Sequence, residues 1–308
     1  MKLKKPHIHL GIPTLRYGPN LLLSTSSCTP SSSKIMSNSN EKSKPISSVQ
    51  RVASWLAHIF ALTSLGLVIA WAGGTDKAQG YLGGFNWTNN TFNFHPVMMV
   101  GGLLVVGTEG MLAYRFWPFG HCMNKIIHGC LHTIGLVMVI VGLIAAFLSH
   151  NSVTHGGMKP NLYTAHGFVG IFVVTLFFFQ YIMGISAFVV PAIRTKIASA
   201  WVPLHRFLGT FCYFGALMAA GMGIAEKTGF NASPATYVQP DINPALHYKE
   251  MGAGYKIAFG LPITLLFAAF FATFAAYDFP STDSKPVKDN MSVEDGGDVV
   301  PVEEAKAE

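Results

Sequence analysis

Six long apolar stretches dominate this chain of 308 residues, and each is long enough to form a helix that crosses a membrane. Such a helix needs about 20 apolar residues, and only helices and closed barrels satisfy their backbone hydrogen bonds in hydrocarbon. Half of the residues are hydrophobic, 12% are charged and the mean hydropathy is +0.39, which is too apolar for a soluble protein of this length. The sequence therefore predicts an all-α membrane protein with six transmembrane helices. The expected spans are approximately residues 52–72, 96–116, 126–148, 166–190, 203–224 and 255–277.

The basic residues indicate the orientation, because Lys and Arg are retained on the cytoplasmic side of a membrane. With six spans, both tails share one side with the loops after the second and fourth spans, and this side holds 16 of the 21 Lys and Arg residues. Both termini of this multi-pass integral membrane protein are therefore predicted to be cytosolic. Glycosylation sequons at Asn86, Asn89 and Asn231 fall in the opposite, outer loops, whereas a fourth at Asn290 falls in the cytosolic tail.

The two tails have compositions that cannot form a packed core. Residues 1–50 are rich in Ser and basic, with seven Lys or Arg and one acidic residue, and residues 279–308 are acidic. Both tails are predicted to be disordered, and they flank a transmembrane domain over residues 51–278. For the N-terminal tail, an organelle transit sequence and an alternative start at Met36 both stay open. The net charge of +6 comes mainly from this tail, so no folded basic surface for nucleic acid is expected.

Four histidines lie near the ends of four successive spans. The path of the chain places His95 and His166 near the outer surface, and His128 and His205 near the inner one. Ionisable side chains are costly in hydrocarbon, so those found there usually have a function. Side and depth pair His95 with His166 and His128 with His205, each pair coming from two parallel helices of a central antiparallel four-helix bundle. This pattern predicts two bis-histidine haem sites stacked across the bilayer, an arrangement that favours electron transfer over oxygen activation.

Any haem in this chain is expected to be bound without covalent attachment, because the sequence has no CxxCH motif. Its four cysteines form no CxxC pair and none lies in an outer loop, so no disulfide framework is expected either. Glycines near the histidines leave space for a flat porphyrin, although glycine also permits close helix packing without a cofactor. These glycines are Gly101, Gly102, Gly129, Gly135, Gly167, Gly170, Gly209 and Gly215.

Two further histidines have alternative interpretations. His132 lies one helical turn beyond His128 on the same face and is the alternative inner ligand. His150 ends the third span on the outer side, where it contacts either a substrate or metal, or only the membrane interface. The other histidines are expected at the surface or the interface: His7, His9, His58, His121, His155 and His247.

Short motifs occur in a fixed order from the second span to the end of the fifth. They are Phe94-His95-Pro96, Ala113-Tyr114-Arg115, His150-Asn151, Tyr163-x-x-His166, Pro203-x-His205 and Met222-Gly223-x-x-Glu226-Lys227. In this order they resemble the cytochrome b561 family, and the resemblance covers about residues 52–277. It implies two non-covalent haem b groups with His95/His166 and His128/His205 as iron ligands. It also implies an enzyme that transfers electrons from cytosolic ascorbate to monodehydroascorbate or a ferric iron chelate on the far side of the membrane.

The same resemblance implies two substrate sites, although no catalytic residue is assigned. Lys125 and Arg115 would belong to the cytosolic ascorbate site. An arginine of the family is replaced here by Ala198, which leaves Lys196 or Arg194 as a substitute. On the outer side the candidates are His150 and Tyr163, but residues 164–168 read Thr-Ala-His-Gly-Phe where the family has Ser-Leu-His-Ser-Trp. The membranes implied are the endosomal, lysosomal, vesicle, vacuolar or plasma membrane.

Two other classes of function remain open. A haem-binding sensor or assembly subunit without ascorbate turnover would keep the histidines and lose the substrate cations. A metal transporter would need carboxylates along its path, and Glu109 is the only acidic residue well inside a predicted span. The oligomeric state also stays open, with a homodimer among the alternatives.

Overall fold

The computed structural model describes residues 46–152, 160–189, 191–231 and 251–277, and the described residues form helices and short connections without strands. Six of these helical segments are long and apolar enough to cross a membrane, which confirms the all-α architecture. The predicted disordered tails lie outside the described residues, except for residues 46–50, of which residues 48–50 belong to the first helix. The six spans are Ser48–Gly73, Thr91–Phe116, Met123–Asn151, Ala165–Ser186, Trp201–Phe230 and Ala253–Ala276.

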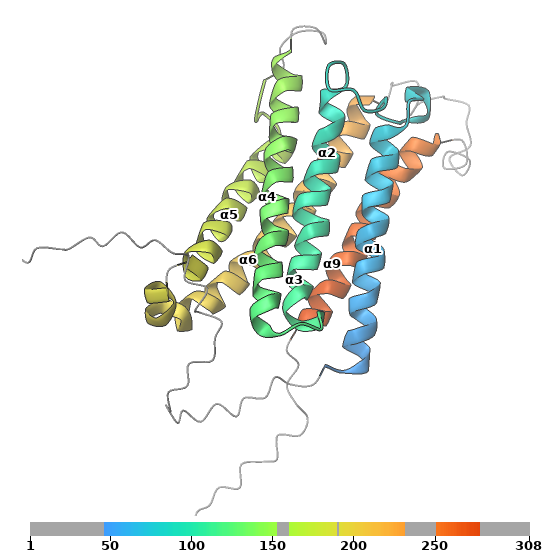
Figure 1. The fold of residues 1–308 in the computed structure, drawn as a ribbon. Helices are drawn as coiled ribbons and strands as arrows, with labels where there is room; N and C mark the ends of the chain where they lie inside the picture. The colour runs from blue at the N-terminus through green and yellow to red at the C-terminus, as the bar shows by residue number, and fades with distance from the viewer. Residues whose placement is uncertain (1–45, 153–159, 190, 232–250, 278–308) are drawn as a thin grey trace, which may run out of the picture. The chain divides into compact units, whose positions relative to one another are not determined.

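The chain divides into two units, Met1–Ala276 and Tyr277–Glu308, and every described helix belongs to the first (Figure 1). Within it, α1 packs against α9, α5 against α6, and α3 against α4. The helices of the bundle are α1 (Ser48–Gly73), α2 (Phe94–Met99), α3 (Val106–Phe116), α4 (His121–Asn151), α5 (Ala165–Val189), α6 (Pro191–Asn231) and α9 (Ala253–Ala276).

The first helix begins at Ser48, because the residue before it forms a capping box. The Ser47 hydroxyl accepts from the backbone N–H of Gln50 at 3.2 Å, and the Gln50 side chain accepts from the backbone N–H of Ser47 at 3.3 Å. The Gln50 amide also donates to the carbonyl of Ala275 at 3.4 Å. The start of α1 and the end of α9 therefore lie at the same end of the bundle, as an even number of spans requires.

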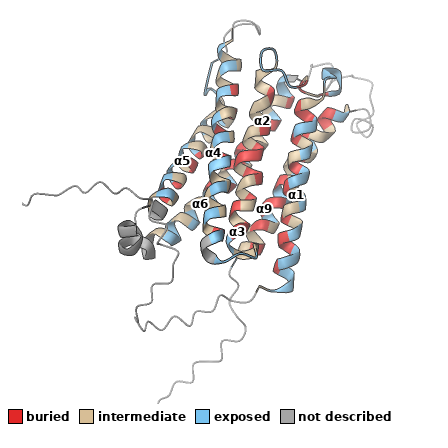
Figure 2. Ribbon diagram, in the orientation of Figure 1, coloured by how far each residue is buried: buried red, intermediate tan, exposed pale blue. Residues whose placement is uncertain are grey.

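The second span is the central helix of the bundle. Its most apolar window is 61% buried, against 22–33% for the other five spans, and Figure 2 shows buried residues along much of its length. Between α2 and α3 it contains one π-helical segment, η4 (Val100–Val105), a local distortion that is frequent at functional sites. A Cβ on Gly102 would lie 2.9 Å from the carbonyl oxygen of Gly135 on α4. These two glycines therefore allow close backbone packing of the second and third spans.

The fifth span belongs to a helix longer than predicted. The sequence suggests a start at Pro203, whereas α6 begins at Pro191 and continues through Pro203 without a break. Proline removes one backbone hydrogen bond of a helix. A transmembrane helix tolerates this loss when neighbouring helices or side chains satisfy the carbonyl that is left free. The segment that carries Arg194 and Lys196 is consequently helical, although the positions of these two side chains lie outside the described part of the structure.

Candidate haem sites

His95 and His166 face one another near one end of the bundle. They lie on α2 and α5, and their ring centroids are 6.1 Å apart with the rings nearly perpendicular, at 84°. The Nδ1–H of His95 donates to the carbonyl of Gly142 at 3.0 Å, and that of His166 donates to the carbonyl of Ala219 at 2.9 Å. A carbonyl only accepts, so both protons are on Nδ1 and both Nε2 lone pairs are free to bind a metal.

His128 and His205 form the equivalent pair toward the other end. They lie on α4 and α6, with ring centroids 6.3 Å apart and an interplanar angle of 72°. The Nδ1–H of His128 donates to the carbonyl of Gly110 at 2.8 Å. In the described part of the chain, the Nδ1 of His205 is buried without a hydrogen-bond partner. Three of the four imidazoles are thus held by backbone carbonyls from other spans.

The spacing of both pairs fits a metal ion held between two imidazoles. A metal–nitrogen bond is about 2 Å long, and the ring centre lies about 1 Å behind the nitrogen, so opposed ligands place the centroids about 6 Å apart. Three of the glycines predicted to make room, Gly129, Gly170 and Gly209, would carry a Cβ with no atom within 4 Å. The buried amide of Gln180 has no partner for either of its polar atoms within the described residues, which marks a further polar position available to a bound group. These residues fit haem.

His132, the alternative inner ligand, packs beside the inner pair. Its ring centroid is 4.4 Å from that of His128 and 6.0 Å from that of Phe177. A Cβ on Gly110 would lie 2.7 Å from its Nε2, so the bare glycine backbone is the surface that accommodates this ring. His132 is therefore enclosed between α3, α4 and α5, while His128 faces His205.

The two pairs are well separated along the bundle. Gly142, which accepts from outer His95, and His128 of the inner pair lie on the same helix, α4. At a rise of about 1.5 Å per residue, the two levels are roughly 20 Å apart. This is a large part of the hydrocarbon thickness of about 30 Å.

The predicted inner substrate residues have different surroundings. Arg115, at the end of α3, donates to the carbonyl of Ala276 and to the side chain of Gln50, both at 3.4 Å, so its guanidinium is engaged by α9 and α1. Lys125 is half-buried on α4, three residues before His128. Tyr114, which lay inside a recognised motif but was assigned no role, packs its ring 5.0 Å from His128.

At the predicted outer end, His150 belongs to a hydrogen-bond network. Its Nδ1 lies 3.1 Å from Oδ1 of Asn161, whose amide donates to Asn151 at 2.9 Å. Tyr163, the other outer candidate, follows Asn161 by two residues and is 50% exposed. Asn161 was not singled out from the sequence, because a loop asparagine carries no signal until the fold brings it to the end of the third span.

A second outer feature reaches the histidine pair itself. The ammonium of Lys227 lies 4.5 Å from the centre of the Phe92 ring, and that ring is 5.6 Å from His95. In the sequence, only its place in the Met222-Gly223-x-x-Glu226-Lys227 motif distinguishes Lys227. A single aromatic ring, that of Phe92, therefore separates the Lys227 ammonium from His95.

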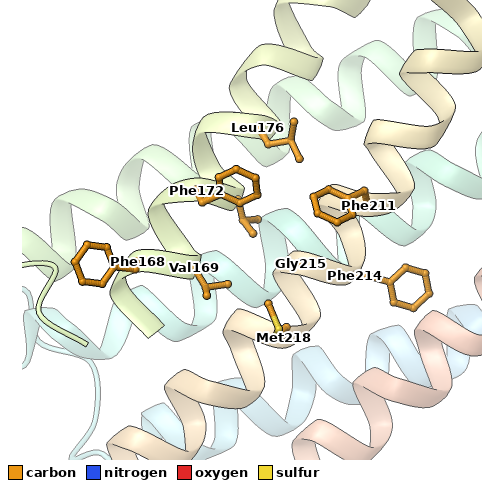
Figure 3. A pocket seen from close by; sticks show the side chains of 9 residues that line it. Phe168, Val169, Phe172, Leu176, Phe211, Phe214, Gly215 and Met218 are labelled. Carbon is orange, nitrogen blue, oxygen red and sulfur yellow. The ribbon is translucent and has the colours of Figure 1, made fainter. Parts of the chain in front are cut away.

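A hollow between α5 and α6 has an apolar lining that includes none of the four paired histidines. Its volume is about 420 Å³, and Figure 3 shows phenylalanines from both helices around it. Gly215, one of the glycines predicted to accommodate a porphyrin, lines it and instead packs against α5, because a Cβ there would lie 2.8 Å from Val173. The residues around the hollow are Phe168, Val169, Phe172, Val173, Leu176, Phe211, Phe214, Gly215 and Met218.

Fold and site together define a polytopic helical membrane protein with two bis-imidazole sites stacked along one bundle. Residues 94–231 match the model of the eukaryotic cytochrome b561 family. The chain is 34% identical to transmembrane ascorbate ferrireductase 1 of Arabidopsis thaliana over 221 residues. The aligned region covers 70% of this chain and 84% of that protein. It is 35% identical to ascorbate-specific transmembrane electron transporter 2 of Zea mays, over 58% of this chain and 73% of the relative.

A lysosomal membrane ascorbate-dependent ferrireductase of Homo sapiens is 31% identical, over 62% of this chain and 79% of that protein. The chain belongs to the cytochrome b561 family, and it is a transmembrane oxidoreductase. Membership of this family implies haem b as the cofactor, which agrees with the fit of the histidine pairs.

Proposed function

We propose that this protein transfers electrons across a membrane from cytosolic ascorbate, through two bis-histidine haem b groups, to monodehydroascorbate or ferric iron on the opposite side. The observation that carries the proposal is a pair of facing imidazoles at each of two levels of one bundle. The ring centroids are 6.1 Å apart in one pair and 6.3 Å apart in the other. The names of the relatives, which are ascorbate-dependent ferrireductases and electron transporters, support the donor and the acceptor.

The chain's own residues provide the binding and the insulation. His95 and His166 would hold the outer haem, and His128 and His205 the inner one. Haem iron with two imidazole ligands supplies reversible one-electron transfer and offers no open position to oxygen. The carbonyls of Gly142, Gly110 and Ala219 orient three of the imidazoles and keep each Nε2 available. Apolar side chains such as Phe177, which is 8% exposed and whose ring lies 6.0 Å from that of His132, would keep water away from the inner site.

Cationic side chains near the inner pair would bind the donor. Ascorbate is a monoanion at neutral pH, so positive charge at the cytosolic end raises its local concentration and orients it. Lys125 stands closest in sequence to the inner ligand His128, and we assign it the main role. Arg115 would contribute its charge from the end of α3, and Lys196 or Arg194 would take the place of the arginine that is absent at Ala198.

The acceptor would bind at the outer end, near His150 and Tyr163. The hydrogen-bond network of His150, Asn161 and Asn151 presents both donors and acceptors at this surface. Lys227, through Phe92, places positive charge beside outer His95. Both monodehydroascorbate and ferric chelates with carboxylate ligands are anions, which such a surface attracts.

Ascorbate should reduce the purified protein rapidly, and Lys125→Ala should slow this reduction about fivefold at low ascorbate without changing the haem spectra. An ion pair at a half-exposed position contributes up to about 1 kcal/mol, which corresponds to roughly a fivefold change in affinity. Stopped-flow absorbance at several ascorbate concentrations measures this, and added salt should slow the wild type.

Lys256→Ala is the matched control, because this lysine lies at the opposite end of the bundle, near the start of α9. It should behave as the wild type does. A haem protein that ascorbate does not reduce would contradict the proposed donor and favour a haem-binding sensor or assembly subunit.

The sidedness predicts which asparagines carry glycans. Asn86 and Asn89 are exposed in the loop between the first two spans, and one of them should be glycosylated, whereas Asn290 should not be. Glycosidase treatment of single-sequon variants expressed in eukaryotic cells measures this as a shift in gel mobility. A glycan on Asn290 would invert the topology and exchange the inner and outer assignments. The side chains of Asn231 and Asn290 lie outside the described part of the structure.

A further inference from the structure

A histidine and a glutamate from two different spans meet inside the membrane region. The Nδ1 of His58 on α1 lies 2.8 Å from Oε1 of Glu109 on α3, and the two side chains are 23% and 21% exposed. The sequence suggested a surface or interfacial position for His58, and this is wrong: the histidine faces the only acidic residue well inside a predicted span. A carboxylate is costly there even when paired, so such pairs usually have a function.

A line of polar side chains connects this pair with the end of the bundle where α1 begins. Gln50, Ser54 and His58 are spaced four residues apart and so share one face of α1. Gln50 and Ser54 are both only 4% exposed, although the rest of α1 is largely apolar. The hydroxyl of Ser54 is 3.5 Å from Nε2 of His58. Each turn of this face of α1 between the pair and the proposed cytosolic end thus carries a polar side chain.

The pair is also linked to the inner haem site. Glu109 is followed by Gly110, whose carbonyl accepts from Nδ1 of His128 and whose bare α-carbon contacts His132. A single peptide unit of the backbone thus joins Glu109 to the carbonyl that holds an inner ligand. In a medium of low dielectric constant, charges on neighbouring helices interact strongly.

The other titratable or charged groups around the pair come from the neighbouring helices. Tyr213 on α6 interacts with Glu109, while its hydroxyl is 2.7 Å from that of Thr108. Helix α9 carries no charged residue between Ile257 and Ala276. Further groups are His128 and His132 on α4, and Arg51 and Arg115 toward the proposed cytosolic ends of α1 and α3.

We propose that the His58–Glu109 pair is a proton-binding site coupled to the redox state of the inner haem. His58 takes up one proton at Nε2, delivered from the cytosolic end through Ser54, when the inner site gains one electron. The imidazolium formed stays beside the Glu109 carboxylate, and the added positive charge offsets the added electron. The charges balance with the proposed donor, because an ascorbate monoanion that loses one electron yields the monodehydroascorbate radical anion and one proton.

This inference deepens the proposed function and rests on it, so its test uses redox mediators and no ascorbate. Over a range of about pH 5 to pH 9, the potential of the inner haem should rise as the pH falls, because proton uptake then favours the reduced state. Uptake of one proton per electron corresponds to about 59 mV per pH unit over the coupled range. The potential of the outer haem should stay nearly constant. Titration of His95→Ala, which retains only the inner haem, assigns the two transitions.

Glu109→Gln and His58→Gln should each remove the pH dependence of the inner potential, while Glu109→Asp should retain part of it. Ser64→Ala is the matched control, because it removes another buried contact of α1, the 2.8 Å hydrogen bond to Thr264 on α9, at about 9 Å along the helix from His58. It should keep the wild-type slope. A wild-type inner potential independent of pH would overturn the inference, and so would a slope that persists in both pair variants.

The titration also separates this inference from the proposed function. If both haem potentials are independent of pH and ascorbate reduces the protein rapidly, only the proposed proton site is contradicted. If the potential of the inner haem depends on pH but ascorbate fails to reduce the protein, only the proposed electron donor is contradicted. If the glutamine variants fail to bind haem, the slope of the wild type and that of Glu109→Asp still decide the question.

Discussion

Replacement of either His95 or His166 by alanine should remove the same haem, and replacement of either His128 or His205 should remove the other. Each pair faces across one site at a separation that accommodates one metal between two imidazoles. Loss of either ligand leaves the iron with a single imidazole and an open position, which abolishes the bis-histidine site. Haem quantification and redox titration should show one remaining species in every single variant. Double variants within a pair should be no worse than the singles.

The control for this prediction is His132→Ala, which removes an imidazole 4.4 Å from His128 on the same helix. Both haems should remain, with a change limited to the spectrum or potential of the inner one. If His132→Ala instead loses the same haem as His205→Ala while His128→Ala does not, the inner ligand is His132. Loss of both haems in every variant would indicate a general failure of folding and would contradict two independent sites.

Gly223→Ala should weaken the outer haem selectively. A Cβ at this position would lie 2.7 Å from Cε1 and 2.9 Å from Nδ1 of His166, so the imidazole would have to leave its hydrogen bond to Ala219. Overpacking of this kind costs about 2 kcal/mol, which corresponds to roughly a 30-fold loss of haem affinity. Transfer of haem to an excess of a haem-scavenging protein, followed by the absorbance of each site, measures the effect.

Gly221→Ala provides a matched control two residues earlier on α6, because a Cβ there would meet no atom within 4 Å. Both changes add the same methyl group and the same gain in helix propensity, so their difference isolates the contact with His166. Gly221→Ala should retain both haems as the wild type does. Equal affinities of the outer haem in the two variants would show that His166 does not depend on the space at Gly223.

The number of spans and the depth of the four paired histidines can be predicted from the amino-acid sequence alone. Both follow from one-dimensional patterns, since hydrocarbon thickness sets the length of an apolar stretch and alternating direction sets the side on which each helix end lies. His95, His128, His166 and His205 could therefore be sorted into two levels before any fold was known. The family followed from the order of short motifs around the same residues.

The groups that support those histidines, and the polar residues that meet between spans, become apparent only when the helices are packed together. The acceptors for His95, His128 and His166 are backbone carbonyls on other helices, which carry no signature in sequence. The contact between His58 and Glu109 depends on the rotation of α1 and α3 about their axes. Hydropathy predicts the depth of a residue but not this rotation, because a span that is apolar on every side shows no preferred face; close packing, such as that between Gly102 and Gly135, selects it.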